Sequence, residues 1–277
     1  KKYFYNMIQL YKWNKGGDYL YFEKKSNRLY TNFTFLSSHY RLNNVKLNNE
    51  PLEEFDITSS FPLMLAIYCM KVSPDIVNDY DFREYCTSIK KKSFYQDLTD
   101  LLNKIKDCNN NHGESATGKR AFTKDIVKKL FQIFLNGDSN RNVYIEGFSN
   151  SFILEQFELK YPCIFEIIEK VKSNDELLYY KLSKLETEYI FNIIEGLYQN
   201  YADIKILTCH DALYLSLSYA EKAKEIWDNH MEALLNTLPD NLKEEKVEIN
   251  ILEDFGIYDG DNLSPKKRSK YYMTLTQ

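Results

Sequence analysis

The sequence has no long hydrophobic run, no paired cysteines and no overall excess of positive charge. No apolar stretch approaches the roughly 20 residues of a membrane-spanning helix and no signal peptide opens the chain, so we expect a cytoplasmic protein without membrane contact. The five cysteines are scattered and form no CxxC pair, which argues against a disulfide framework and a zinc site. The net charge of −4 gives no overall sign of a nucleic-acid-binding domain.

The composition otherwise suits a globular protein. The 277 residues are 44% apolar and 27% charged, enough for one large domain or two smaller ones. The first residue is not methionine, which is consistent with a fragment of a longer chain. A bias toward Lys, Asn, Ile and Tyr indicates an AT-rich genome, and we expect a bacterial, phage or mobile-element origin.

Local patterns predict a mixed α and β organisation. Residues 17–36 alternate aromatic and polar side chains around "KSN", which is typical of an antiparallel hairpin. Residues 204–218 predict two strands joined at His210-Asp211, and 75–118 show only weak helical periodicity. Further helices are expected at about 61–70, 122–136, 148–172, 180–200 and 219–237, followed by a strand-like segment, "KVEINILED".

Two aspartates stand at the ends of predicted strands. Asp56 closes the apolar run in "EEFDITSSFPLMLA", and Asp211 lies at the tip of the predicted hairpin. Either one alone is most simply a turn residue, because aspartate is common in turns. Two such carboxylates that converge in space can hold two divalent metal ions at the spacing used for in-line phosphoryl transfer.

Positive charge gathers between these aspartates. Residues 119–129 hold five basic residues and one acidic residue, and a second basic cluster lies at 264–272. A polar stripe runs along one face of the helix predicted here, with a residue every four positions: Lys124, Lys128, Gln132 and Asn136. The stripe could bind the triphosphate of a nucleotide, and the alternative is an ordinary amphipathic helix with lysines in water.

The three segments resemble motifs A, B and C of the family A DNA polymerases and the related single-subunit phage-type RNA polymerases. "FDITSSFP" resembles motif A, "KDIVKKLFQIFLNG" resembles motif B, and "CHDALYL" resembles motif C, in that order along the chain. The resemblance implies an α+β fold: an antiparallel palm sheet with packing helices, plus a mostly helical fingers insertion. The implied boundaries are palm 1–75, fingers 76–199, and palm with a basic tail 200–277.

The resemblance also implies residue roles in adding nucleoside triphosphates to the 3′-hydroxyl of a DNA (or RNA) primer on a template. Asp56 and Asp211 would bind two Mg²⁺ ions, with Mn²⁺ as a substitute, and Ile57 would offer its backbone oxygen. Lys128 would stabilise charge on the triphosphate and protonate the leaving pyrophosphate. The remaining matches would line the nucleotide (Lys124, Gln132, Asn136) or contact nucleic acid (His210, Lys184, Glu186). Arg28 and Arg41, which precede motif A, are candidates for phosphate contacts to primer or template.

Several positions depart from the family pattern. Gln132 and Asn136 replace the usual apolar residue and tyrosine of motif B, and Ala212 follows the motif C aspartate. Only 55 residues precede Asp56, too few for a thumb or an exonuclease, so we expect a fragment or a minimal member. Phe61 lies where DNA-polymerising relatives carry a bulky side chain against the ribose 2′ position, which favours deoxynucleotides.

Three alternatives remain open at this stage. They are a phage-type RNA polymerase, a template-independent or specially primed transferase on the same palm, and a catalytically inactive module that binds nucleic acid or a partner. Retention of Asp56, Asp211 and Lys128 argues against the inactive module, because two carboxylates repel each other without a metal.

Overall fold

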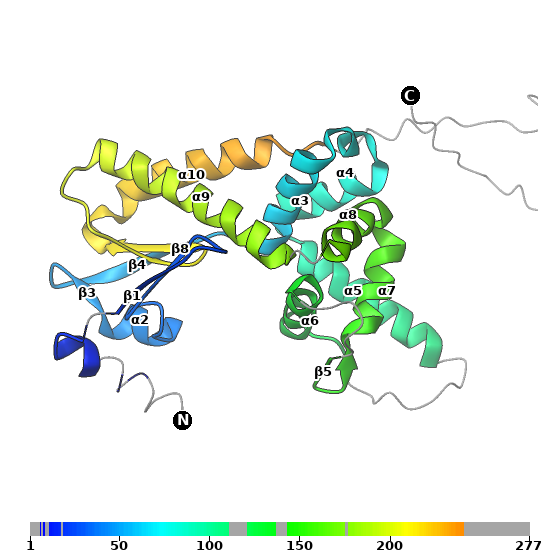
Figure 1. The fold of residues 1–277 in the computed structure, drawn as a ribbon, viewed down its shortest axis with the longest axis horizontal. Helices are drawn as coiled ribbons and strands as arrows, with labels where there is room; N and C mark the ends of the chain where they lie inside the picture. The colour runs from blue at the N-terminus through cyan, green and yellow to red at the C-terminus, as the bar shows by residue number, and fades with distance from the viewer. Residues whose placement is uncertain are drawn as a thin grey trace, which may run out of the picture. The chain divides into compact units, whose positions relative to one another are not determined.

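The computed structural model contains a four-stranded antiparallel sheet in the order β3-β4-β8-β7 (Figure 1). Its strands are β3 (Lys46–Leu47), β4 (Glu50–Asp56), β7 (Ile206–Cys209) and β8 (Ala212–Ser216). The central pair joins distant parts of the chain, since β4 pairs with β8 along its length. The predicted pair of strands at 204–218 is therefore confirmed, with its turn at His210-Asp211.

The structure describes Asn6, Ile8 and residues 11–17, 19–110, 121–136, 143–174 and 177–240, with only the backbone of 107–110. Residues 1–240 form one compact unit. The predicted strand "KVEINILED", the basic cluster at 264–272 and Gly137 lie outside the described residues.

A separate two-stranded hairpin precedes this sheet. Its strands are β1 (Leu20–Glu23) and β2 (Arg28–Thr31), and Glu23 is the cross-strand partner of Arg28. Asn27 ends the connecting loop in the left-handed region, φ 57°, which asparagine tolerates better than most residues. The hairpin predicted within residues 17–36 is confirmed.

The two faces of the sheet pack against different partners, because successive residues of a strand point to opposite sides. On one face, Phe55 meets Trp227 of α10 (Ala220–Asn236), with ring centroids 5.7 Å apart. On the other face, Tyr214 meets Phe33 at 4.9 Å, near α2 (Ser38–Asn44). Helix α9 (Leu178–Asn200) contacts both α10 and α3 (Ser60–Val72).

The remaining elements are mostly helical. They are η1 (Pro74–Asn78), α4 (Tyr80–Lys90), α5 (Phe94–Asn110), α6 (Lys124–Asn136), β5 (Tyr144–Ile145), β6 (Phe148–Ser149), α7 (Asn150–Lys160), α8 (Pro162–Ser173) and η2 (Leu217–Tyr219). An aromatic core joins several of them, in which Phe157 of α7 packs on Phe131 and Phe134 of α6. Every helix in the described ranges is too short or too polar to span a lipid bilayer.

The helical region agrees with the expectation of a mostly helical segment and differs from the sequence prediction in one place. Residues 75–110 are almost wholly helical, because α4 and α5 bury apolar residues such as Phe82, Phe94 and Leu102 despite their charged surfaces. The single helix expected at 148–172 is two helices that meet at Tyr161. Pro162 begins α8, since proline suits a first turn and disrupts a helix interior.

Candidate active site

Strand pairing brings Asp56 and Asp211 together. Asp56 ends β4 opposite Ala212, the first residue of β8. The next backbone N–H, that of Ile57, donates a hydrogen bond to the carbonyl oxygen of Asp211 over 3.1 Å. Neighbouring strands lie about 5 Å apart, so the two carboxylates occupy the same end of the sheet. This is the convergence that the sequence predicted.

The backbone at both aspartates contains a left-handed residue. His210 has φ 56° at the first position of the two-residue turn between β7 and β8, a position that favours glycine. Ser59 has φ 57° and immediately precedes α3. Non-glycine residues in this region cost free energy and concentrate at functional sites. Positive φ also occurs away from this site, as at Lys92 and Glu146, so its bearing on function at His210 depends on the adjacent Asp211.

The electrostatics of the pair oppose ionisation. Asp56 reaches solvent, but crowding by protein atoms, followed by the charges of Asp211 and Glu54, raises its pKa to about 7. Burial likewise raises the pKa of Asp211 above its ordinary value. A bound divalent cation would relieve this repulsion, because it favours the ionised form of both groups.

Helix α6 supplies a positive charge to the pair. Its buried face is the one predicted from the sequence, with Ile126, Val127, Leu130, Phe131 and Phe134 in the core. Of the polar stripe, Lys124, Lys128 and Asn136 are exposed and Gln132 is half-buried. The Lys128 ammonium lowers the pKa of both Asp56 and Asp211, so its charge partly offsets their repulsion.

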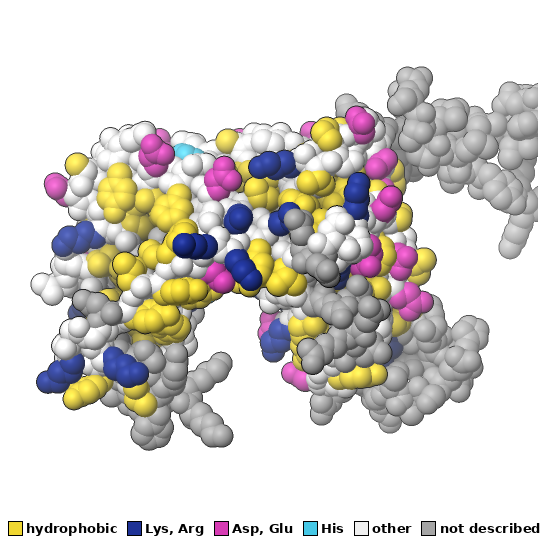
Figure 2. All heavy atoms as spheres, in the orientation of Figure 1, with side chains coloured by type: hydrophobic (Ala, Val, Ile, Leu, Met, Phe, Trp, Pro, Cys, Tyr) yellow, Lys and Arg dark blue, Asp and Glu magenta, His cyan; other side chains and the backbone are white. Residues whose placement is uncertain are grey.

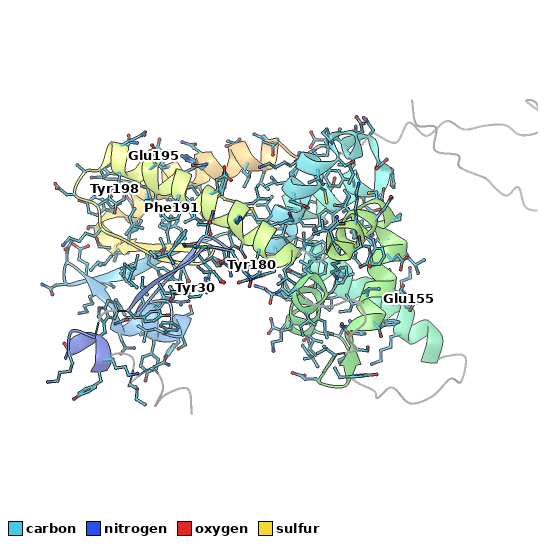
Figure 3. All side chains as sticks on the ribbon, viewed as in Figure 1. Tyr30, Glu155, Tyr180, Phe191, Glu195 and Tyr198 are labelled. Carbon is cyan, nitrogen blue, oxygen red and sulfur yellow. The ribbon has the colours of Figure 1, made fainter. Side chains whose placement is uncertain are left out.

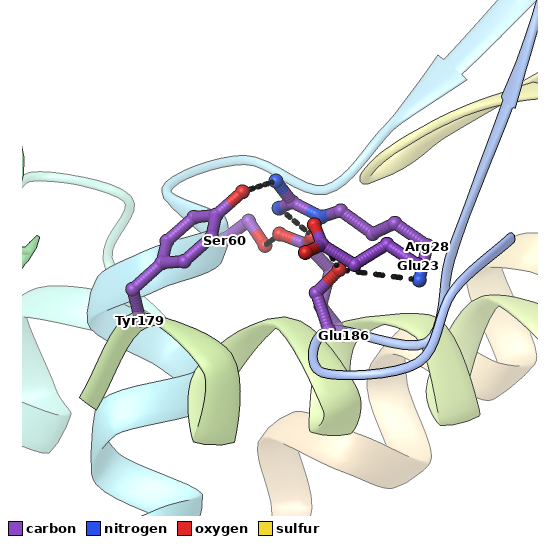
Figure 4. A network of polar contacts seen from close by, with 6 residues as sticks. Glu23, Arg28, Ser60, Tyr179 and Glu186 are labelled. Atoms are coloured by element: carbon purple, nitrogen blue, oxygen red, sulfur yellow. Dashed lines mark hydrogen bonds and ion pairs between the residues drawn. The ribbon is translucent and has the colours of Figure 1, made fainter. Parts of the chain in front are cut away.

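A buried polar network lies beside the pair (Figure 4). Arg28 of β2 forms an ion pair with Glu186 of α9 and donates a second hydrogen bond to the Tyr179 hydroxyl. The hydroxyl of Ser60, at the start of α3, donates to Glu186 over 2.6 Å. Glu186 is only 1% exposed, and burial raises its pKa although Arg28 opposes the shift. The network therefore links β2, α3 and α9.

The structure places both predicted phosphate-binding arginines in internal contacts. Arg28 is buried in the network, and its terminal nitrogens donate hydrogen bonds to Glu186 and to the Tyr179 hydroxyl. Arg41 donates to the Leu36 carbonyl oxygen over 3.0 Å and to Cys209 Sγ over 2.9 Å. Its guanidinium also lies over the Tyr214 ring, 5.3 Å from the centroid. Both arginines thus make structural contacts within the protein, which differs from the predicted phosphate contacts.

Phe61 and His210 also lie close to the network. The Phe61 ring is half-buried and stacks on Tyr179 with centroids 5.9 Å apart. Burial, and then the charges of Arg28 and Arg41, lower the pKa of His210 to about 4, so its imidazole is neutral at pH 7. Its Nδ1 is buried without a hydrogen-bond partner among the described residues. Lys184, by contrast, is exposed and lies two positions from Glu186, on another side of α9.

The chain matches no family model, curated protein or solved structure. Function is therefore inferred from the residues and geometry of the site.

The donor set suits a hard cation. In the described ranges, no three His, Cys, Asp or Glu side chains group closely enough to hold a metal ion. Two carboxylates are nonetheless the usual protein contribution for Mg²⁺ in phosphoryl transfer, since this ion keeps several waters and binds substrate phosphates. Asp56, Asp211 and the backbone oxygen of Ile57 are the groups that would hold it.

Sequence reasoning missed Tyr95 at this site. Tyr95 of α5 is 3% exposed, and its hydroxyl has no hydrogen-bond partner in the part of the chain that the structure describes. Burial, and then the charge of Asp211, raise its pKa. Among 23 tyrosines, nothing in "SFYQDL" distinguishes this one. A separate surface cavity, lined by Tyr68, Asp79 and Cys163, includes none of the candidate site residues.

Proposed function

We propose that this protein is a template-directed nucleotidyltransferase that adds deoxynucleoside triphosphates to a 3′-hydroxyl. The observation that carries the proposal is the pairing of Asp56 with Asp211 at adjacent strand ends; the charge of Lys128, which lowers the pKa of both, supports it. The α+β arrangement of an antiparallel sheet and a helical segment supports it. A nucleic-acid-synthesising role fits a cytoplasmic protein of a bacterium, phage or mobile element.

Each residue has a defined part in this mechanism. Asp56 and Asp211, with the Ile57 backbone oxygen, would hold two Mg²⁺ ions, which when bound activate the 3′-oxygen and stabilise the leaving oxygen. Lys128 stabilises negative charge that develops on the triphosphate and can give a proton to pyrophosphate. Lys124, Gln132 and Asn136 extend the nucleotide surface along α6.

Two further groups position the substrates. Phe61 at the start of α3 excludes a 2′-hydroxyl by its bulk, and Tyr179 holds the ring in place by stacking. Neutral His210 lies beside Asp211, where it can donate to or accept from the primer terminus. The stacking contact on Tyr179 supports a preference for deoxynucleotides because it limits movement of the ring.

Primer extension tests the proposal. A labelled primer on a DNA template is incubated with Mg²⁺ and either dNTPs or NTPs, using the full chain, Asp56→Asn and Asp211→Asn. We expect extension with dNTPs that each substitution lowers by more than about a hundredfold, since metal coordination contributes several kcal/mol. Efficient extension with NTPs alone would identify an RNA polymerase. Extension without a template would identify a template-independent transferase, and extension that survives both substitutions would refute the metal site.

A further inference from the structure

The β1–β2 hairpin exposes a run of large apolar side chains beside the candidate active site. Tyr19, Leu20, Tyr21 and Phe22 are 46%, 73%, 51% and 51% exposed. Figure 2 shows a band of hydrophobic side chains over this part of the molecule, with Lys and Arg side chains close by. Soluble proteins seldom gather so many exposed large apolar side chains on one short hairpin unless one of its faces binds a partner.

A line of aromatic contacts runs from this surface to the carboxylate pair. Tyr21 is the cross-strand partner of Tyr30, with ring centroids 6.2 Å apart. Tyr30 in turn meets the His210 ring edge-on at 5.4 Å, and His210 directly precedes Asp211. The exposed hairpin is thus continuous with the candidate active site.

The hairpin region is basic within an acidic chain. Residues 11–31 contain five basic and two acidic residues, whereas the whole chain has a net charge of −4. Lys24 and Lys25 in the hairpin loop are exposed, and the Lys25 ammonium lies 5.6 Å from the Tyr180 ring centroid. Figure 3 shows Tyr180 at the end of α9 nearer to Tyr30 of β2, whereas Tyr198 lies toward the other end of α9.

We propose that the β1–β2 hairpin binds an unpaired nucleic-acid strand. Bases stack on Tyr21 and on the adjacent Tyr30 and Tyr180, and Lys24 and Lys25 contact phosphates. Alternating cations and aromatic rings are the chemistry by which proteins bind single strands without sequence preference. That the bound nucleic acid continues toward Asp56 and Asp211 rests on the proposed function. Binding of the nucleic acid to the hairpin does not require catalysis.

Strand alternation supplies a matched control. Tyr21 shares a face of the hairpin with Tyr30, whereas Phe22 points to the opposite face and is equally exposed. Binding of a fluorescently labelled oligothymidylate to the full chain is measured by anisotropy, without nucleotide. We expect Tyr21→Ala to raise Kd about tenfold and Tyr21→Phe to bind normally, because stacking needs only the ring. Phe22→Ala and Tyr198→Ala should leave Kd within about twofold.

Salt dependence tests the lysines. The slope of log Kd against log salt concentration should fall by about 1.4 in the Lys24→Ala/Lys25→Ala double variant, since each phosphate contact on a single strand contributes about 0.7. An unchanged slope would remove the lysines from the interface. Lys205→Ala, an exposed lysine that binds Asn48, serves as the control.

The outcomes separate this site from the catalytic proposal. Unchanged binding in Tyr21→Ala, or a duplex that competes as well as the single strand, would overturn the hairpin site. Self-association that Tyr21→Ala abolishes, with no loss of oligonucleotide binding, would instead assign the surface to a second copy of this chain. Oligonucleotide binding that Tyr21→Ala weakens supports the hairpin site even if the wild-type chain extends no primer, in which case only the catalytic proposal fails.

Discussion

Strand pairing holds Asp56 beside Asp211. In the metal-free protein, the repulsion between the two carboxylates lowers the stability of the folded state. Both carboxyl groups have raised pKa values, so ionisation at neutral pH weakens the folded state. Sites built for chemistry often reduce stability in this way. Activity and stability should therefore respond in opposite directions when one carboxylate is removed.

The first prediction is that Asp56→Asn stabilises the metal-free protein. Loss of the charge relieves repulsion with Asp211 and Glu54, and we expect the Tm at pH 7.5 to rise by about 2 °C, a small effect because Asp56 reaches solvent. Thermal unfolding in EDTA measures it. Asp203→Asn, at an exposed position, should leave the Tm unchanged. A lower Tm for Asp56→Asn would show that repulsion between the carboxylates does not destabilise the folded protein.

The second prediction concerns the hydroxyl oxygen of Tyr95 and its effect on stability. Its buried hydroxyl has no partner among the described residues, and such a group costs about 1–3 kcal/mol of desolvation. We expect Tyr95→Phe to raise the free energy of unfolding by about 1 kcal/mol in urea titrations. Tyr85→Phe is the control, because the Tyr85 hydroxyl donates to the Pro62 carbonyl oxygen over 2.9 Å and its loss should destabilise. Equal destabilisation by both would indicate that Tyr95 has a partner.

Helix α6 carries two adjacent exposed lysines, of which Lys128 alone lowers the pKa of the carboxylates. Lys128 lowers the pKa of Asp56 and Asp211, and Lys129 is its exposed neighbour, about 100° around the helix. We expect Lys128→Ala to lower kcat/KM for nucleotide at least about tenfold without lowering the Tm, since under the proposed function the ammonium acts on the triphosphate. Lys129→Ala should retain both values. Equal kinetic losses in the two variants would point to general electrostatic attraction.

The Arg28–Glu186 pair joins β2 to α9, and its removal tests that connection. Removing one partner of a buried ion pair leaves the other charge uncompensated and should cost about 3–5 kcal/mol. Arg28→Met with Glu186→Leu together should cost less than either single change, because no charge then remains unpaired. Urea unfolding of the four proteins completes the cycle. Additive losses would mean that the two side chains act independently.

At the scale of the whole chain, metal binding and stability are linked through pH. The folded-state pKa of Asp56 is raised to about 7, so the stability lost by its ionisation grows as pH rises from about 4 to about 7. Asp211 and Glu186 act in the same direction. His210 acts oppositely, since its lowered pKa costs stability as pH falls from about 6.5 to about 4.

Mg²⁺ distinguishes the pH-dependent effect of Asp56 and Asp211 from that of His210, because the ion would bind only the ionised carboxylates. The rise in Tm produced by saturating Mg²⁺ should be small near pH 5 and larger near pH 8. Differential scanning fluorimetry at both values measures it, with Asp211→Asn as the variant that should lose the effect. A rise of equal size at both pH values would place the metal elsewhere.

The sequence predicted those parts of the site that depend on local patterns. Asp56 and Asp211 could be placed at strand ends because apolar residues flank them, and the buried face of α6 follows from its periodicity. The partners of Arg28 and Arg41 could not be predicted. Glu186 lies 158 residues from Arg28, and Cys209 lies 168 residues from Arg41, so only the tertiary fold determines these contacts. The position of Tyr95 near Asp211 could not be predicted either, because it too depends on the tertiary fold.

The pairing of β4 with β8 also has a consequence for synthesis of the protein. Asp56 and Asp211 are 155 residues apart in the sequence, and the whole helical segment must be translated between them. At about 5–20 residues per second, roughly 8–30 seconds pass before the ribosome supplies the second carboxylate. A chain that ends before Asp211 therefore lacks one member of the proposed catalytic pair, and under the proposed function activity can begin only after β8 docks on β4.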